Sequence, residues 1–204
     1  MSLFSRNRYP AHLEDELSFG KQVLIFFWEV FKVLVISLVI IVPIRHFLIK
    51  PFYVKGASME PNFYDHEYLI INQLGYRLGE PSRGDAVVFR YPFDTRQYFI
   101  KRVIGLPGET VKISGGNITI INAEHPSGVV LQESYLSPSI DTLGEVQVTL
   151  TADEYYVLGD NRQSSLDSRA FGPVKRDLII GETFLRGWPI NKAGLVTNQT
   201  NYNL

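Results

Sequence analysis

The sequence pattern of this chain changes from helical to β-type at the stretch Tyr53-Val54-Lys55-Gly56-Ala57-Ser58-Met59-Glu60-Pro61. A long apolar segment precedes it, and short β-type runs separated by Gly, Pro and Asp turns follow it. Ser58 stands here between small residues and a Met-x-Pro turn, on backbone to which Gly56 allows a close approach. The stretch places a candidate nucleophile at the junction of lipid and water, although most Gly-Ala-Ser clusters are ordinary loops.

The apolar segment covers residues 23–44 and is interrupted only by Glu29 and Lys32. Its uncharged part, residues 33–44, would form a helix only about 18 Å long, short of the roughly 30 Å hydrocarbon layer. A membrane span must therefore include Glu29 and Lys32, which can pair at this spacing while Lys32 reaches towards the interface. We expect a polar tail over residues 1–22 and a transmembrane anchor over residues 23–48.

Two other interpretations of this segment are a buried core helix and a cleaved secretory signal. A buried core helix is the usual interpretation of a 12-residue apolar run, but the wider 22 residues are too uniformly apolar for one. A cleaved signal needs small residues after the apolar run, and Arg45-His46-Phe47 supplies none. Lysine and arginine occur on both sides of the segment, so charge does not decide its orientation.

The remainder of the chain reads as mainly β. Hydrophobic runs typical of strands occupy residues 68–72, 86–91, 98–104, 110–113, 117–121, 146–150, 154–158 and 178–185. We expect one β domain over residues 49–190, in which residues 113–150 form a small inserted subdomain because they are the least hydrophobic portion. Residues 191–204 are expected to form a polar C-terminal tail that is frayed from Asn198 onward.

Composition excludes several kinds of function. The net charge of −1 over 204 residues argues against nucleic acid as a partner, because phosphate binding needs an excess of Lys and Arg. The chain has no cysteine, which removes disulfides, thiolate nucleophiles and cysteine-based zinc sites. Its four histidines lie outside any metal-binding spacing. We therefore expect neither a metal nor another cofactor.

Lys101 is the candidate base. It lies in the hydrophobic run Phe99-Ile100-Lys101-Arg102-Val103-Ile104, where alternation on a strand sends Lys101 and Arg102 to opposite faces. Burial of Lys101 beside Phe99 would lower its pKa from about 10.4 towards the value of roughly 7 to 8 that a general base needs. The alternative is a lysine on the wet face of an edge strand, where it discourages aggregation.

A third polar cluster, residues 159–172, directly follows a hydrophobic strand and is rich in hydroxyl, amide and carboxylate side chains. It is either a solvated loop held by Asx turns and an Asp–Arg pair, or a set of hydrogen-bonding groups that orients a nearby catalytic group. The chain has no Gly-x-Ser-x-Gly motif and no Ser-His-Asp order. Ser58 and Lys101, 43 positions apart, are therefore the nucleophile and base that we favour.

Taken together, these stretches resemble the type I signal peptidases, which are membrane-bound serine proteases with a Ser–Lys dyad. The resemblance covers about residues 23–188. Four segments in the right order carry it: residues 56–61 around Ser58, 83–92 in the central strand, 98–109 around Lys101, and 159–172. The family implies antiparallel β-sheets with a small inserted subdomain behind one N-terminal transmembrane helix.

The resemblance also implies roles for individual residues. Ser58 would attack the scissile carbonyl, and a neutral, buried Lys101 would take its proton. Ser165 would hydrogen-bond the amine of Lys101 and direct it towards Ser58. The supporting residues would be the ion pair of Asp160 with Arg102, together with Asp167 and Arg169.

One position departs from some members of the family, although the family includes members with glycine at this position. Gly56 stands where some relatives carry a second oxyanion-hole serine, so only the Ser58 backbone N–H remains as an assigned donor.

The implied substrate is an N-terminal signal peptide of an exported preprotein, cleaved after small residues of the Ala-x-Ala type. Such a substrate would bind as an extended strand. We expect its small side chains to contact six apolar residues, Phe52, Val54, Met59, Phe63, Phe99 and Ile100.

The implied location is the non-cytoplasmic face of a cell membrane, near the protein export translocon, although a thylakoid or other internal membrane also fits. Phe47, Leu48 and Phe52 would keep the site at the bilayer surface. Relatives of the endoplasmic reticulum use histidine as the base, so Lys101 favours a bacterial or organellar enzyme.

Two alternatives remain open. One is a self-cleaving Ser–Lys protease like the SOS-response repressors, which carry a DNA-binding domain in place of a membrane span. The other is a membrane-tethered, non-enzymatic β-domain that binds extended peptides. Cleavage by the normally folded chain would distinguish the enzymes from the binding domain.

Overall fold

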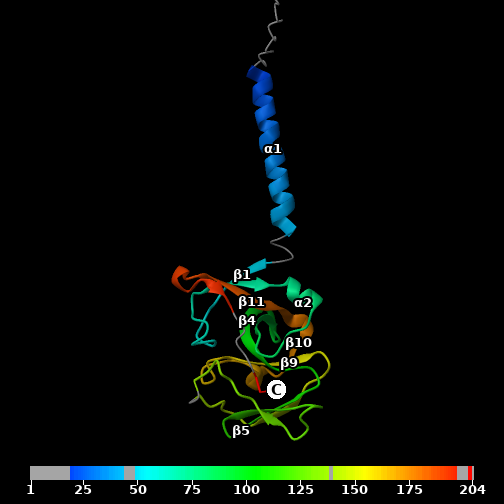
Figure 1. Ribbon diagram of the computed structural model, residues 1–204, viewed down its shortest axis with the longest axis vertical. Helices are drawn as coiled ribbons and strands as arrows, with labels where there is room; N and C mark the ends of the chain where they lie inside the picture. Colours follow the sequence, from blue (N-terminus) through cyan, green and yellow to red (C-terminus); the bar gives the residue numbers. More distant parts are fainter. Residues whose placement is uncertain (1–18, 44–48, 138–139, 197–201, 204) are drawn as a thin grey trace, which may run out of the picture. The chain divides into compact units, whose positions relative to one another are not determined.

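The computed structural model describes residues 19–43, 49–137, 140–196 and 202–203. It divides the chain into two compact units, Met1–Pro43 and Ile44–Leu204. The described part of the first unit is one helix, α1 (Phe19–Pro43), and the second unit is mainly β (Figure 1). The predicted fold class, antiparallel sheets preceded by one apolar helix, is therefore confirmed.

Helix α1 is long and apolar enough to cross a membrane. Its 25 residues correspond to about 37 Å at 1.5 Å per residue, and none of them is buried. Glu29 and Lys32 pair at 2.6 Å, so the helix accommodates both charges inside the apolar segment. The helix starts at Phe19 rather than at residue 23 and ends at Pro43; the expected contacts of Phe47 and Leu48 lie outside the described residues.

The larger sheet of the β unit has eight strands in the order β1-β2-β11-β3-β4-β9-β10, with β12 paired to β11. All its pairings are antiparallel. Its strands are β1 (Ile49–Tyr53), β2 (Tyr68–Asn72), β3 (Ala86–Tyr91), β4 (Asp94–Gly105), β9 (Glu154–Leu158), β10 (Val174–Lys175), β11 (Ile179–Trp188) and β12 (Gly194–Leu195). Among the described residues, four short helices connect them: α2 (Leu74–Leu78), α3 (Ser168–Phe171), η2 (Arg176–Leu178) and η3 (Ile190–Lys192).

A smaller sheet is inserted between β4 and β9. Its strands, in the order β7-β6-β5-β8, are β5 (Thr110–Ser114), β6 (Asn117–Ile121), β7 (Val129–Val130) and β8 (Val146–Thr149). Figure 1 shows this sheet at the opposite end of the β unit from β1. Its apolar residues pack with Ile104, Tyr156 and Leu158 of the larger sheet in one core cluster. The expected insertion is thus a separate sheet built on the β4–β9 edge, and it begins slightly before residue 113.

Alternation along β3 distributes its side chains between two further cores. Val87 and Phe89 pack in one cluster with β9 and α3, and Ala86 and Val88 pack in another with Leu69 and Ile71 of β2. The C-terminal residues differ from the expected frayed tail. Tyr202 packs against the cluster of the smaller sheet, and the Asn203 side chain hydrogen-bonds the backbone of Val130 and Gln132.

Candidate active site

The segment with Ser58 is a loop between β1 and β2 whose two ends are joined by backbone hydrogen bonds. The N–H of Val54 donates to the carbonyl of Glu67 at 2.9 Å, and that of His66 donates to Val54 at 3.1 Å. Met59 is 1% exposed and anchors the middle of the loop in the core. Gly56 has φ +89° with open space around its Cβ position, so the backbone conformation favours glycine here.

The segment after β9 holds the backbone of Ser58. The N–H of Asn161 donates to the Ser58 carbonyl, and the Asn161 side-chain amide donates to the Ala57 carbonyl, both at 3.1 Å. Gly159 allows this approach, because a Cβ at this position would lie 2.1 Å from Ser165 Oγ and 2.5 Å from the Ser58 carbonyl oxygen. The structure thereby brings the first and last of the four predicted segments together.

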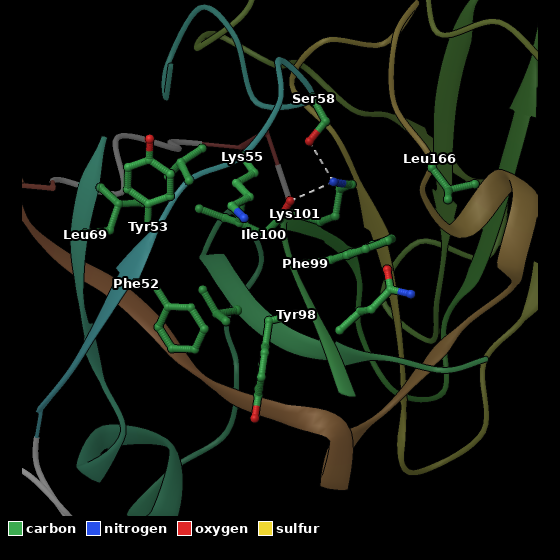
Figure 2. Close-up of a pocket in the computed structure, with 13 residues that line it drawn as sticks. Phe52, Tyr53, Lys55, Ser58, Leu69, Tyr98, Phe99, Ile100, Lys101 and Leu166 are labelled. Carbon is green, nitrogen blue, oxygen red and sulfur yellow. Dashed lines mark hydrogen bonds between the residues drawn. The ribbon is translucent and has the colours of Figure 1, made fainter. Parts of the chain in front are cut away.

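Lys101 reaches Ser58 from β4. Its Nζ lies 2.8 Å from Ser58 Oγ and 2.8 Å from the carbonyl oxygen of Ile100 (Figure 2). The side chain is 4% exposed and lies over the ring of Phe99, with 5.4 Å between Nζ and the ring centroid. The expected proximity of this serine and this lysine is thus present.

Burial lowers the pKa of Lys101 from its ordinary value of 10.5 to about 8, while Asp167 and Asp160 oppose this shift by favouring the charged amine. A difference of this size is equivalent to about 3 kcal/mol. A substantial fraction of the amine is therefore neutral at mildly alkaline pH, and a neutral amine can accept the hydroxyl proton of Ser58.

Arg102 turns to the other side of β4 and forms a buried ion pair with Asp160. Its Nε and Nη2 donate to the two carboxylate oxygens at 2.8 and 2.6 Å, and Nη1 donates to the carbonyl of Gly84. Asn62 of the Ser58 loop donates to the same carboxylate at 2.8 Å. Because breaking a buried pair costs about 3 to 5 kcal/mol, this contact fixes the position of Asp160 and of the segment beside Ser58.

Asp167 is fully buried and pairs with Arg169 through both carboxylate oxygens. It also accepts the N–H of Gly159 at 3.1 Å. Burial opposes ionisation of Asp167, but Arg169 and the Gly159 N–H outweigh it and lower the carboxyl pKa. Asp167 therefore stays charged and holds the turn that contacts Ser58.

Ser165 differs from the expected arrangement. Its hydroxyl is buried and has no partner of full hydrogen-bond geometry among the described residues, although it contributes to the lowered pKa of Asp167. Lys101 donates to Ser58 and to the Ile100 carbonyl instead. The second hydrogen-bond partner of Lys101 Nζ is thus the backbone carbonyl of Ile100, where the Ser165 hydroxyl was expected.

A pocket of about 590 Å³ opens beside Ser58 and Lys101 (Figure 2). Four of the six expected residues, Phe52, Val54, Phe99 and Ile100, line it. Met59 and Phe63 do not, since both point into the core with Leu69 and Ile71. Their spacing in the sequence could not show this, because the loop between β1 and β2 has no strand alternation.

Sequence reasoning missed several residues at this site. The pocket is also lined by Tyr53, Lys55, Leu69, Val88, Gln97, Tyr98 and Leu166. Asn62 was missed because its partner Asp160 is 98 positions away. No three His, Cys, Asp or Glu side chains come together as potential metal ligands in the part of the chain that the structure describes.

A family model described as "Signal peptidase, peptidase S26" matches residues 27–188 of this chain. The chain is 38% identical over 177 residues to a probable signal peptidase I-2 of Synechocystis sp.. This alignment covers 83% of this chain and 77% of the relative. The chain is also 38% identical to a signal peptidase I of Leptolyngbya laminosa, covering 81% and 82% of the two chains. A solved signal peptidase I of Enterococcus faecalis matches with 33% identity and a TM-score of 0.43, covering 51% of this chain and 97% of that one.

The structure places a serine beside a buried lysine in antiparallel β-sheets, and the relatives are signal peptidases, which are hydrolytic enzymes. The chain belongs to the signal peptidase family, peptidase S26, and is a type I signal peptidase.

Proposed function

We propose that this enzyme is a membrane-anchored serine endopeptidase in which Ser58 is the nucleophile and Lys101 the general base. Membership of the family assigns the cleavage of signal peptides to the chain. The observation that carries the proposed chemistry is the 2.8 Å contact between Ser58 Oγ and the buried Lys101 amine, whose pKa is lowered to about 8. A base with this pKa is suited to proton transfer near neutral pH.

In the acylation step, neutral Lys101 accepts the hydroxyl proton while Ser58 Oγ attacks the scissile carbonyl carbon. The tetrahedral intermediate collapses when the C–N bond breaks, and the departing amine takes the proton from Lys101. Water then attacks the acyl-enzyme, with Lys101 again accepting a proton and returning it to Ser58. The products are the signal peptide, with a new carboxylate, and the mature protein.

The oxyanion needs donors that are free to point at it. The backbone N–H of Ser58 has no acceptor among the described residues, whereas the N–H of Gly56 donates to Asp65 at 2.9 Å. We propose the Ser58 N–H as the principal donor. The loss of one such donor costs about 3 to 4 kcal/mol in comparable sites. We propose that a second backbone donor or a bound water serves where some relatives use a second serine.

The apolar and aromatic lining of the pocket supports the binding of apolar substrate side chains. Phe52 and Tyr98 form one wall through an edge-to-face contact, with ring centroids 5.3 Å apart. We propose that alanine-sized side chains of an extended substrate enter this pocket and that larger side chains are rejected by the aromatic wall. Phe52, Val54, Phe99 and Ile100 are the residues proposed to contact the substrate.

The proposed location is a membrane, with α1 as the single span and the β unit on the non-cytoplasmic face. The length and composition of α1 support the span. Preproteins that emerge from an export translocon would then be the substrates, in the plasma membrane or in an internal membrane such as a thylakoid. A lysine base favours a bacterial or organellar enzyme.

The test is cleavage of a purified precursor with an Ala-x-Ala site by the full chain in detergent. Ser58→Ala should lower kcat by about 10⁴-fold or more, and Lys101→Met by about 10²- to 10⁴-fold or more. Methionine keeps most of the volume of the lysine stem, so Lys101→Met separates loss of the amine from loss of packing. Ser164→Ala, an exposed serine of the neighbouring loop, is the matched control and should retain wild-type activity.

Wild-type rates in folded Ser58→Ala would reject the nucleophile. Cleavage within the enzyme itself, in place of precursor cleavage, would favour the self-cleaving alternative. Saturable peptide binding without any cleavage by the wild type would favour the non-enzymatic β-domain.

A further inference from the structure

A second pocket of the β unit, about 450 Å³ in volume, is strongly cationic and lies outside the proposed catalytic machinery. Its charged lining residues come from four elements that are distant in the sequence. They are Lys50 of β1, Arg77 of α2, Arg90 of β3, and Arg176 and Asp177 of η2. Four cations therefore face one carboxylate, an arrangement that attracts anions.

Part of this pocket is a rigid frame. Arg176 pairs with Glu80 at 2.7 Å and donates to the backbone carbonyls of Tyr76 and Gly79, so it joins η2 to α2. The Tyr76 ring also lines the pocket, and its hydroxyl hydrogen-bonds the buried Asp85. The charge of Arg176 is thus compensated by Glu80, while the walls around it are held in place.

Two other cations are available to a ligand. Neither Lys50 nor Arg90 makes an ion pair or a side-chain hydrogen bond within the described ranges. The Lys50 ammonium lies 5.7 Å from the ring centroid of Phe52 and 5.3 Å from that of Tyr98. These rings cover one side of the ammonium without neutralising its charge.

The pocket includes a residue that is close in the sequence to the end of α1. Lys50 is the seventh residue after Pro43, the last residue of α1. Figure 1 shows β1, α2 and β11 together at one end of the β unit. If α1 spans a bilayer, as proposed above, this short connection ties the unit that holds the pocket to a membrane surface.

We propose that this pocket binds the phosphate of an anionic phospholipid headgroup. Two uncompensated cations match a phosphodiester, and basic pockets beside a membrane span recognise such headgroups. A lipid is favoured over a free phosphate ion because the bilayer presents it at high local concentration. Since Lys50 contacts Phe52 and Tyr98, a bound headgroup also lies beside the wall of the substrate pocket.

The test compares the purified full chain with two double variants. Lys50→Gln/Arg90→Gln removes the two available cations, and Lys112→Gln/Lys175→Gln removes two exposed lysines of β5 and β10 as a control of equal charge. Native mass spectrometry measures how much phosphatidylglycerol, phosphatidylcholine or inorganic phosphate each protein retains. The precursor assay is run on the same samples.

We expect the wild type to retain phosphatidylglycerol in preference to phosphatidylcholine. Lys50→Gln/Arg90→Gln should weaken this retention about 25-fold, equivalent to about 2 kcal/mol for two charges, and the control should not. Equal retention by both double variants, or no preference between the lipids, would overturn the proposal. Inorganic phosphate bound as tightly as phosphatidylglycerol would overturn the lipid as the ligand.

The two proposals fail in different ways. An active wild type without lipid preference contradicts only the lipid site. A wild type that is inert towards the precursor but retains phosphatidylglycerol through Lys50 and Arg90 contradicts only the proposed catalysis.

Discussion

Lys101 is subject to opposing influences on its protonation. Burial disfavours the ammonium form, and the carboxylates of Asp167 and Asp160 favour it. Burial is the larger influence, so the pKa falls to about 8. Asp160 is itself paired with Arg102, which reduces its effect on Lys101. This lowered pKa supports the proposed use of a lysine, in place of a histidine, as the base.

This balance predicts the pH dependence of cleavage. If the neutral amine of Lys101 is the base, as proposed, kcat/KM should rise with pH through a pKa of about 8 and level off above it. The measurement is the initial rate on a short peptide that contains the cleavage site, at subsaturating concentration. Lys175→Ala, which removes an exposed lysine, should leave the profile unchanged. A rate that is flat or falls between pH 7 and 9 would contradict Lys101 as the base.

At the scale of elements, the site depends on how closely β9 and the segment after it approach the Ser58 loop. Gly159 makes this possible because no side chain separates it from Ser165 and from the Ser58 carbonyl. The Arg102–Asp160 pair and the Asp167–Arg169 pair then hold this segment from both sides. Three elements thus meet at one point: the β1–β2 loop, β4 and the segment after β9.

Gly159→Ala should therefore impair catalysis by displacing Ser58. The added methyl group would overlap Ser165 and the Ser58 carbonyl, so we expect about 1 to 3 kcal/mol of destabilisation. A displacement of about 1 Å should lower kcat on the order of 10²-fold. Urea unfolding and single-turnover kinetics measure the two effects.

Two other glycines serve as controls. In Gly105→Ala the added Cβ would lie 2.4 Å from the Val111 side chain, at the junction of the two sheets. This variant should lose stability with a smaller effect on kcat. In Gly194→Ala the added Cβ would enter open space, so neither stability nor kcat should change. Equal kcat for Gly159→Ala and Gly194→Ala would show that Gly159 does not position Ser58.

At the scale of the whole molecule, the chain separates into an apolar helix without buried residues and a β unit with its own cores. We expect a truncated chain that starts at Ile44 to fold, because every residue of the three core clusters follows that point. Its melting temperature should lie within a few degrees of that of the full chain. This corresponds to a difference in the free energy of unfolding of about 1 kcal/mol or less. Circular dichroism in detergent measures this, with Ser58→Ala in the full chain as a folded reference.

The truncated chain should still cleave a soluble peptide but should be extracted from membranes by alkaline carbonate. Retention of the truncated chain in the membrane would show that the full chain has a second membrane anchor besides α1. An unfolded truncated chain would contradict the independence of the β unit.

Local pattern was sufficient for much of the fold. The expected strands at residues 68–72, 86–91, 117–121 and 154–158 coincide with β2, β3, β6 and β9, because alternation and β-branched residues act over a few positions. Strand β1 was not predicted as a strand, since Pro51 lies within it, and its edge position in the sheet tolerates a proline. Helices α2 and α3 are too short for a helical period to be visible.

The sequence alone was sufficient to predict an apolar helix followed by a mainly β domain, and to select Ser58 and Lys101 as a pair; the antiparallel arrangement was implied by the family resemblance. The helix, the β domain and the pair follow from composition, alternation and short motifs, which neighbouring residues determine. Only the tertiary structure decided which groups contact Lys101, that Met59 belongs to the core, and that Lys50 and Arg90 share a cationic pocket. Those contacts join residues many positions apart, and their geometry depends on how strands twist and pack, for which no local pattern exists.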